Sequence, residues 1–134
     1  NIEIKNVVQE NTPDINADEK QIERVVSNLV SNALKFTLHG GTITIDAVQS
    51  PVTKDKGQMT AEYIQISVSD TGTGIPQSEL EKIFLRFHQV KGTEKRGTGL
   101  GLTICKHIVE SHGGKISVES ELGKGTKFTV DIPV

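Results

Sequence analysis

The feature that most constrains this chain is one amphipathic segment near its N-terminus. Its apolar residues recur at three- and four-residue spacing, the period of an α-helix; they are Ile22, Val25, Val26, Leu29, Val30 and Ala33. At about 100° per residue, these side chains fall within an arc of roughly 140°. We therefore expect a helix that begins at Asp18, with Gln21 completing a capping box, and ends near Leu38 before a glycine pair.

A polar stripe borders this apolar arc. Asn28, Asn32 and Lys35 follow the spacing i, i+4, i+7, which puts them at the seam between core and solvent. Asparagine is a poor helix former because its amide competes for backbone hydrogen bonds, so two of them one turn apart suggest a function. An amide oxygen suits Mg²⁺, and a lysine ammonium suits phosphate. Taken alone, such a stripe is more often a solvated helix edge.

Composition limits the class of protein. The 134 residues predict a single domain over residues 1–134, and the net charge of −2 argues against a nucleic-acid-binding surface. No apolar run approaches the ~18 residues of a membrane helix. The single Cys105 cannot form an internal disulfide, so we expect a cytoplasmic location, with a parent protein that could itself be membrane-anchored. Because the sequence opens without methionine, we expect a domain cut from a longer protein.

The remaining pattern alternates between strand and helix signals. Strands are predicted at residues 1–9, 42–48, 63–70, 116–118 and 128–132. Helices are predicted at residues 78–84, capped by Ser78, and at 100–111, with polar loops at 50–57 and 89–97. Hairpin connections favour an antiparallel or mixed sheet, and three helices can cover only one of its faces. The predicted fold class is an α/β (α+β) two-layer sandwich with a mixed, mostly antiparallel sheet.

A glycine motif follows directly from the third predicted strand, in the sequence Asp70-Thr71-Gly72-Thr73-Gly74-Ile75-Pro76. Its glycines let a flat ligand lie against the backbone, and its carboxylate can accept a hydrogen bond from an exocyclic amine. Ile75 would supply an apolar floor. A dinucleotide fingerprint is excluded, because the third glycine that opens a helix is missing and Pro76 intervenes. Taken alone, the motif is more often a simple turn.

A second glycine motif, Gly97-Thr98-Gly99-Leu100-Gly101-Leu102, lies where a polar loop meets the last predicted helix. Free backbone N–H groups converge there at the positive end of a helix dipole, which favours a phosphate. The Walker A spacing is absent. A third motif, Gly123-Lys124-Gly125-Thr126, lies between two predicted strands and is interpreted as a hairpin turn.

Four segments in order carry a family resemblance: N-L-V-S-N-A-L-K-F-T, D-T-G-T-G-I-P, I-F-L-R-F and G-T-G-L-G-L. Together they resemble the N, G1, F and G2 boxes of sensor histidine kinases, and the similarity covers essentially the whole chain. The resemblance implies the Bergerat ATP-binding fold. It also implies that the chain binds Mg-ATP and transfers the γ-phosphoryl group to a histidine on a separate dimerisation domain.

The resemblance assigns roles by position. Asn32 is similar to the Mg²⁺ ligand, Asn28 lies near the metal or phosphates, and Lys35 is similar to a phosphate contact. At the adenine end, Phe36 is expected to form a wall of the pocket, Asp70 to accept a hydrogen bond from the adenine amine, and Gly72, Gly74 and Ile75 to shape the pocket. Thr126 is at the position of a threonine that supports this aspartate through water. The residues expected to contact the phosphates are Gly97, Thr98, Gly99, Leu100, Gly101 and Leu102. An ATP lid is expected at about 88–98, with Phe84 and Phe87 at its base.

Two positions depart from the family pattern, and both lie in the expected lid. Gln89 stands where many members carry arginine, so Lys91, Lys95 or Arg96 is expected to supply the charge that faces the phosphates. Arg96 also stands where a common G-G-T-G-L-G-L has its first glycine.

Asn28 also bears on the reaction. Related hydrolases and serine kinases carry a glutamate base at this position, and an amide cannot take a proton. A neutral imidazole has a free lone pair near pH 7, so a histidine acceptor is favoured over water. The four histidines of the chain, His39, His88, His107 and His112, lack the setting of an acceptor.

The acceptor is therefore expected on the dimerisation domain of the same parent, with a response-regulator receiver domain as the next partner. The isolated domain is expected to be a monomer, and the parent a homodimer. Two alternatives remain open: an ATPase or serine kinase of another branch of the superfamily, and a non-catalytic nucleotide-sensing module.

Overall fold

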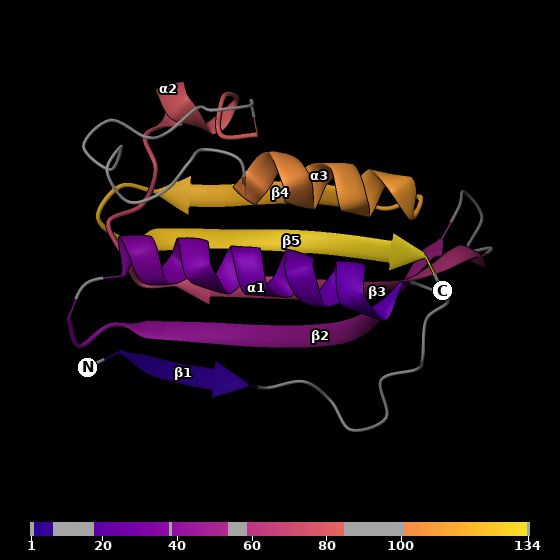
Figure 1. Cartoon of the computed structure of the whole chain (residues 1–134), viewed down its shortest axis with the longest axis horizontal. Coiled ribbons are helices and arrows are strands. Elements are labelled where there is room, and N and C mark those ends of the chain that lie inside the picture. The colour runs from indigo at the N-terminus through magenta and orange to yellow at the C-terminus, as the bar shows by residue number, and fades with distance from the viewer. Residues whose placement is uncertain (1, 7–17, 38, 54–58, 85–100, 134) are drawn as a thin grey trace.

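A five-stranded sheet forms one layer of the molecule, and the two longer helices lie across one of its faces (Figure 1). The computed structural model describes residues 2–6, 18–37, 39–53, 59–84 and 101–133. The strands are β1 (Glu3–Asn6), β2 (Thr42–Thr53), β3 (Met59–Asp70), β4 (Lys115–Glu121) and β5 (Gly125–Pro133), and the helices are α1 (Glu19–Phe36), α2 (Gln77–Leu80) and α3 (Gly101–Ser111).

The strand order in the sheet is β1-β2-β3-β5-β4. β1 pairs with β2 in parallel, and the other three pairings are antiparallel. The expected mixed, mostly antiparallel sheet is therefore confirmed. The β2–β3 and β4–β5 pairs are antiparallel because each joins consecutive strands through a hairpin, whereas the antiparallel β3–β5 pair joins strands that are far apart in the sequence. The parallel β1–β2 pair requires a crossover connection, which contains α1.

The start of α1 agrees with its predicted cap. The Asp18 carboxylate accepts hydrogen bonds from the backbone N–H groups of Lys20 at 3.1 Å and Gln21 at 3.2 Å. The helix ends at Phe36, two residues before the predicted Leu38, which lies outside the described residues. Thr37 takes an extended conformation, and its hydroxyl donates to the Ala33 carbonyl at 2.6 Å. The Thr37 backbone N–H donates to the same carbonyl at 2.9 Å, so this carbonyl accepts two hydrogen bonds at the helix end.

Only half of the predicted capping box forms. The backbone N–H of Asp18 donates to Nε2 of His112 at 3.2 Å, and not to the side chain of Gln21. Nδ1 of the same imidazole lies 2.8 Å from the Ile108 carbonyl, so the ring carries its proton on Nδ1. His112 therefore joins the start of α1 to the end of α3.

The core lies between the sheet and the faces of α1 and α3 that meet it. Its fully buried side chains come from α1 and α3, from the three strands β2, β3 and β5, and from the loop after β3; the largest are Phe128, Leu29, Ile43, Ile75, Ile132, Val25, Val68, Val109, Val130 and Cys105. Burying an aliphatic or aromatic side chain of this size stabilises the fold by about 1.5–3 kcal/mol. The apolar arc predicted for α1 is thus the face that this helix packs on the sheet.

Cys105 behaves as a small apolar residue of the core. Its side chain has no exposed surface, and its thiol lies 3.6 Å from the Val25 carbonyl, to which it donates. Burial raises the pKa of this thiol to about 11. The thiol therefore stays protonated near neutral pH, and the thiolate, the reactive form, is not populated.

Two predicted boundaries are wrong. The loop expected at 50–57 begins later than predicted, because β2 continues to Thr53. The next strand, β3, begins at Met59. Pro51 lies beyond Ile45, where the described pairing of β1 with β2 ends, and pairs with Glu62 of β3. The helix expected at 78–84 is only the four residues of α2, with Pro76 and not Ser78 at its N-cap and no side-chain cap. None of the described helices is long and apolar enough to cross a membrane.

Candidate functional site

A buried carboxylate lies at the end of β3. Asp70 is the last residue of the strand, is 7% exposed, and accepts a hydrogen bond from the Gly72 backbone N–H at 2.8 Å. Burial raises the pKa of this carboxyl above its ordinary value of 3.8, while the N–H groups of Gly72 and Thr126 act in the opposite direction. A carboxylate offers about four acceptor positions, so Asp70 retains acceptor capacity for a donor that the described chain does not supply.

The loop after Asp70 is packed against the end of α1. The Thr73 N–H donates to the Phe36 carbonyl at 3.2 Å. A Cβ atom at Gly72 would collide with that same carbonyl and would lie 2.8 Å from the Asp70 carboxylate, so only glycine fits. Phe36, expected to wall the site, is buried beside this contact. The structure thus brings Asp70, Gly72 and the C-terminal end of α1 together.

The β4–β5 hairpin closes the other side of this loop. The Gly123 N–H donates to the Thr73 carbonyl at 2.9 Å, and Gly125 is packed so closely on the Asp70 carbonyl that a side chain there would overlap it. Asp70 and Thr126 are direct partners in the β3–β5 ladder. The hairpin predicted from the third glycine motif is confirmed, but its second role as a support for the Asp70 loop was not predicted. The alternating glycines at 123 and 125 were the available signal.

Ser120 is the residue at this site that the sequence analysis missed. Its Oγ accepts a hydrogen bond from the Ile75 N–H at 2.7 Å and lies 2.9 Å from the Gly125 carbonyl and 2.7 Å from the Thr126 hydroxyl. One hydroxyl therefore joins the Asp70 loop, the hairpin and β5. No motif in the sequence marks it, because a serine in a strand is ordinary.

The polar stripe of α1 lies at the edge of the core, as predicted. Asn28, Asn32 and Lys35 are all half-buried. Asn28 donates from Nδ2 to the Gly101 carbonyl at 3.4 Å, which links the stripe to the first residue of α3. Nζ of Lys35 lies 5.7 Å from the centroid of the Phe36 ring.

Asn32 has an unusual environment. Its Nδ2 is buried and finds no hydrogen-bond partner in the part of the chain that the structure describes. Such orphaned groups are rare, and an absent water or ion is one of their ordinary explanations. A carboxamide is also a hard oxygen donor of the kind that Mg²⁺ accepts. Asn32 therefore fits a magnesium ion through its Oδ1, whereas the orphaned Nδ2, a donor, would need an acceptor such as a water or a phosphate oxygen.

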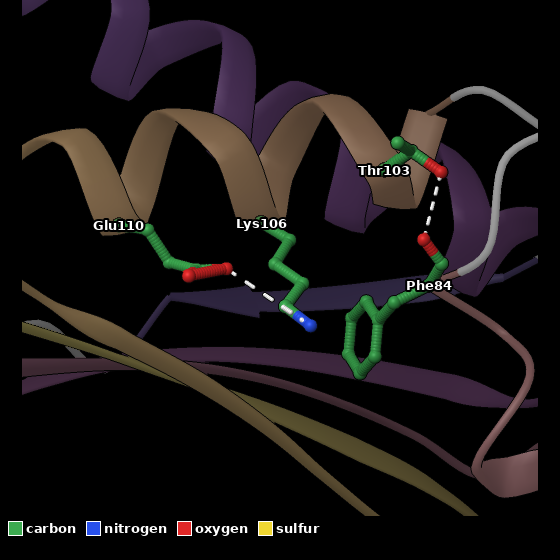
Figure 2. Close-up of polar contacts among 4 residues, drawn as sticks. All are labelled: Phe84, Thr103, Lys106 and Glu110. Carbon is green, nitrogen blue, oxygen red and sulfur yellow. Dashed lines mark hydrogen bonds and ion pairs between the residues drawn. The ribbon is translucent and has the colours of Figure 1, made fainter.

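The beginning of α3 is joined to Phe84 (Figure 2). The Thr103 hydroxyl donates to the Phe84 carbonyl at 2.9 Å, and Nζ of Lys106 lies 5.9 Å from the centroid of the Phe84 ring. Lys106 also faces Glu110 at 4.0 Å, a surface pair that contributes little to stability. Phe84 in turn packs edge-to-face on Phe128 at a centroid separation of 6.3 Å. The described chain on both sides of residues 85–100 is thereby fixed to the core.

Thr103→Val should test this link. The substitution keeps the shape and removes the hydroxyl, so the loss is expected to be about 0.5–1.5 kcal/mol of unfolding free energy, the net value of one neutral hydrogen bond. Denaturant unfolding measures it, with Thr103→Ser as the control that keeps the hydroxyl. A loss in Thr103→Ser with none in Thr103→Val would show that the methyl group, and not the bond to Phe84, matters.

The structure places some predicted site residues and not others. Gly74 and Ile75 are buried in the Asp70 loop, and Gly101 and Leu102 are half-buried at the start of α3. Phe87, the expected lid and most of the second glycine motif lie outside the described residues; these include His88, Lys91, Arg96, Gly97, Thr98, Gly99 and Leu100.

The fold and the site together define a class. A two-layer sandwich with an amide stripe on α1, and with the C-terminal end of that helix packed on the glycine loop of a buried aspartate, has the features of a nucleotide-binding domain of the Bergerat type. The sequence matches the family of histidine kinase-, DNA gyrase B- and HSP90-like ATPases over residues 17–134, and the chain belongs to that family.

Curated relatives place the chain within the histidine kinase branch. It is 40% identical over 137 residues to the adaptive-response sensory kinase SasA of Prochlorococcus marinus strain MIT 9303, covering 100% of this chain and 34% of the relative. It is 41% identical over 123 residues to SasA of Synechococcus elongatus, covering 91% of this chain and 30% of that protein. The chain therefore spans about a third of the length of these relatives.

Solved structures agree with this placement. The nucleotide-free catalytic domain of histidine kinase ThkA superposes with a TM-score of 0.76 at 34% identity, covering 98% of this chain and 80% of that one. Full-length ShkA in complex with AMPPNP gives a TM-score of 0.77 at 33% identity, covering 98% of this chain and 25% of that one. The chain is thus a histidine kinase catalytic domain by fold and sequence, as the resemblance implied.

Proposed function

We propose that this chain binds Mg-ATP and transfers the γ-phosphoryl group to a histidine side chain on the dimerisation domain of its parent protein. The observation that carries the proposal is the buried Asp70 carboxylate, which keeps free acceptor capacity inside a loop where only glycine fits at position 72. A buried charge destabilises a fold unless a hydrogen-bond donor or an opposite charge compensates it. The exocyclic amine of adenine is the donor that would form this hydrogen bond with Asp70.

The phosphate end of the proposed site lies along α1. Asn32 would hold the Mg²⁺ ion, which neutralises phosphate charge during transfer. Lys35 would contact a phosphate, and Asn28 would hold the start of α3 beside it through Gly101. Outside the described residues, we assign Gly97 to Leu100 to the phosphates, a lid to about 88–98, and Lys91 or Arg96 to its charge.

The choice of acceptor follows from Asn28. An amide has no proton-accepting lone pair near neutral pH, and this one already donates to the Gly101 carbonyl. The site therefore lacks a base at the position that would activate water or a hydroxyl. A histidine needs no such base because its neutral ring is itself a nucleophile. We propose a receiver domain of a response regulator as the next partner, a homodimeric parent, and a cytoplasmic location.

Radiolabelled ATP tests the proposal directly. The chain alone should hydrolyse ATP slowly and should not label itself, whereas the dimerisation domain of the parent, added in trans, should acquire phosphate. The adduct should survive base and be lost in acid, as a phosphohistidine is. A dimerisation domain with its acceptor histidine changed to alanine is the control, and it should remain unlabelled.

Two other outcomes would contradict the proposal. Rapid hydrolysis by the chain alone would identify an ATPase. An adduct stable in acid and lost in base would identify a kinase that acts on hydroxyl groups.

A further inference from the structure

Ser120 makes three polar contacts at one oxygen atom, and their chemistry restricts where the protons lie. The Ile75 backbone N–H can only donate, so it occupies one lone pair of the serine oxygen at 2.7 Å. The Gly125 carbonyl can only accept, so the contact at 2.9 Å uses the single hydroxyl proton of Ser120. The third contact, to the Thr126 hydroxyl at 2.7 Å, must then use the proton of Thr126.

This arrangement satisfies every donor and acceptor of the three contacts. In the alternative, Ser120 would donate to Thr126, and the Gly125 carbonyl would lose this partner. Because Thr126 is 4% exposed and makes no other side-chain hydrogen bond among the described residues, its proton has no competing destination there. Thr126 therefore offers only lone pairs to whatever lies beside Asp70, its partner in the β3–β5 ladder.

We infer that Ser120 is a specificity-determining residue, which acts by turning the Thr126 hydroxyl into a hydrogen-bond acceptor. With the ionised Asp70 carboxylate beside it, this end of the site then accepts hydrogen bonds and donates none. A purine with an amino group at C6 matches that pattern, whereas a purine with a 6-oxo group places an acceptor against acceptors. Ser120 touches no reacting atom in this scheme, so it is a positioning residue. The inference rests on the proposed binding of adenine at Asp70.

The test compares the affinities for ATP and inosine triphosphate, each with Mg²⁺, by calorimetry. In Ser120→Ala, the Thr126 proton loses its acceptor and becomes available to a 6-oxo group. The preference for ATP over inosine triphosphate should therefore fall by about 2- to 12-fold, the factor that one neutral hydrogen bond is worth. In a Thr126→Val background, Ser120→Ala should leave the preference unchanged, because no hydroxyl remains to be reoriented.

Each result separates this role from a structural one. If Ser120→Ala weakens both nucleotides equally, Ser120 only holds the hairpin on the loop and the inference is overturned. The same follows if the preference shifts equally in the Thr126→Val background. Should Ser120→Ala not fold, as judged by thermal unfolding, Ser120→Cys carries the comparison, since a thiol fills the space but bonds weakly. A wild-type chain that binds neither nucleotide would overturn the proposed function itself.

Discussion

Asp70→Asn is expected to weaken Mg-ATP binding by about 1–3 kcal/mol, or roughly 5- to 150-fold in Kd. The variant keeps the size of the side chain but exchanges an ionised acceptor for a neutral amide, half of which donates. Charge-assisted hydrogen bonds are about twice as strong as neutral ones, so an amine donor on the ligand loses most of its partner. Calorimetry of wild type and variant under the same conditions measures the change. Equal affinities would remove Asp70 from the adenine site.

The dependence on pH supplies an internal control. Because burial raises the pKa of Asp70 above 3.8, its carboxylate takes up a proton at a higher pH than an exposed aspartate does. Wild-type affinity for ATP should therefore fall as the pH falls through that raised pKa, and the affinity of Asp70→Asn should stay flat there. The sign for stability is opposite, since the folded state binds the proton more tightly than the unfolded state. Ionised Asp70 thus destabilises the fold above its pKa, and the variant should be at least as stable at neutral pH.

Asn32→Ala is expected to weaken Mg²⁺ binding to the nucleotide complex by at least about 10-fold, the lower end of what the loss of a group that supports a metal costs. Metal-free nucleotide binding should be spared. The same change should maintain or raise stability, because it removes a buried amide nitrogen that has no partner among the described residues and introduces the best helix former. Mg²⁺ titrations at fixed ATP, together with thermal unfolding, measure both effects.

Ser31→Ala is the matched control for this substitution. Ser31 lies next to Asn32 in α1 but is exposed, so it should change neither quantity. An unchanged Mg²⁺ titration in Asn32→Ala would show that Asn32 is only a polar edge residue of the helix.

Local patterns predicted most of the fold. The three- and four-residue spacing from Ile22 to Ala33 identified α1 and the face that it buries, because a helix places those positions on one side whatever surrounds it. The strand alternation at Ile64, Ile66 and Val68 has the same local origin. The residue types at Asp70, Gly72 and Asn32 could be singled out because their chemistry is unusual for their positions. Their roles toward a nucleotide remain predictions.

Features that depend on distant parts of the chain could not be predicted. The backbone N–H of Asp18 finds its acceptor on His112, at the far end of the sequence, so the local capping box was only half right. The extension of β2 through Pro51 accompanies its pairing with β3, which a local pattern does not reveal. Ser120 acquires its three contacts only when the β4–β5 hairpin reaches the Asp70 loop. A local sequence pattern contains no information on such long-range contacts unless the fold is already known.

The register that places Asp70 opposite Thr126 has a consequence for the order of folding events. The β2–β3 and β4–β5 hairpins join neighbouring stretches of chain, whereas the β3–β5 ladder joins stretches that are far apart in the sequence. Nonlocal pairing must overcome the largest loop-closure entropy and is expected to form late. The adenine end of the proposed site contains residues from both strands of this β3–β5 ladder, Asp70 and Thr126. The recovery of ATP binding during refolding should therefore follow completion of the whole sheet, and should lag behind the appearance of helical signal from α1.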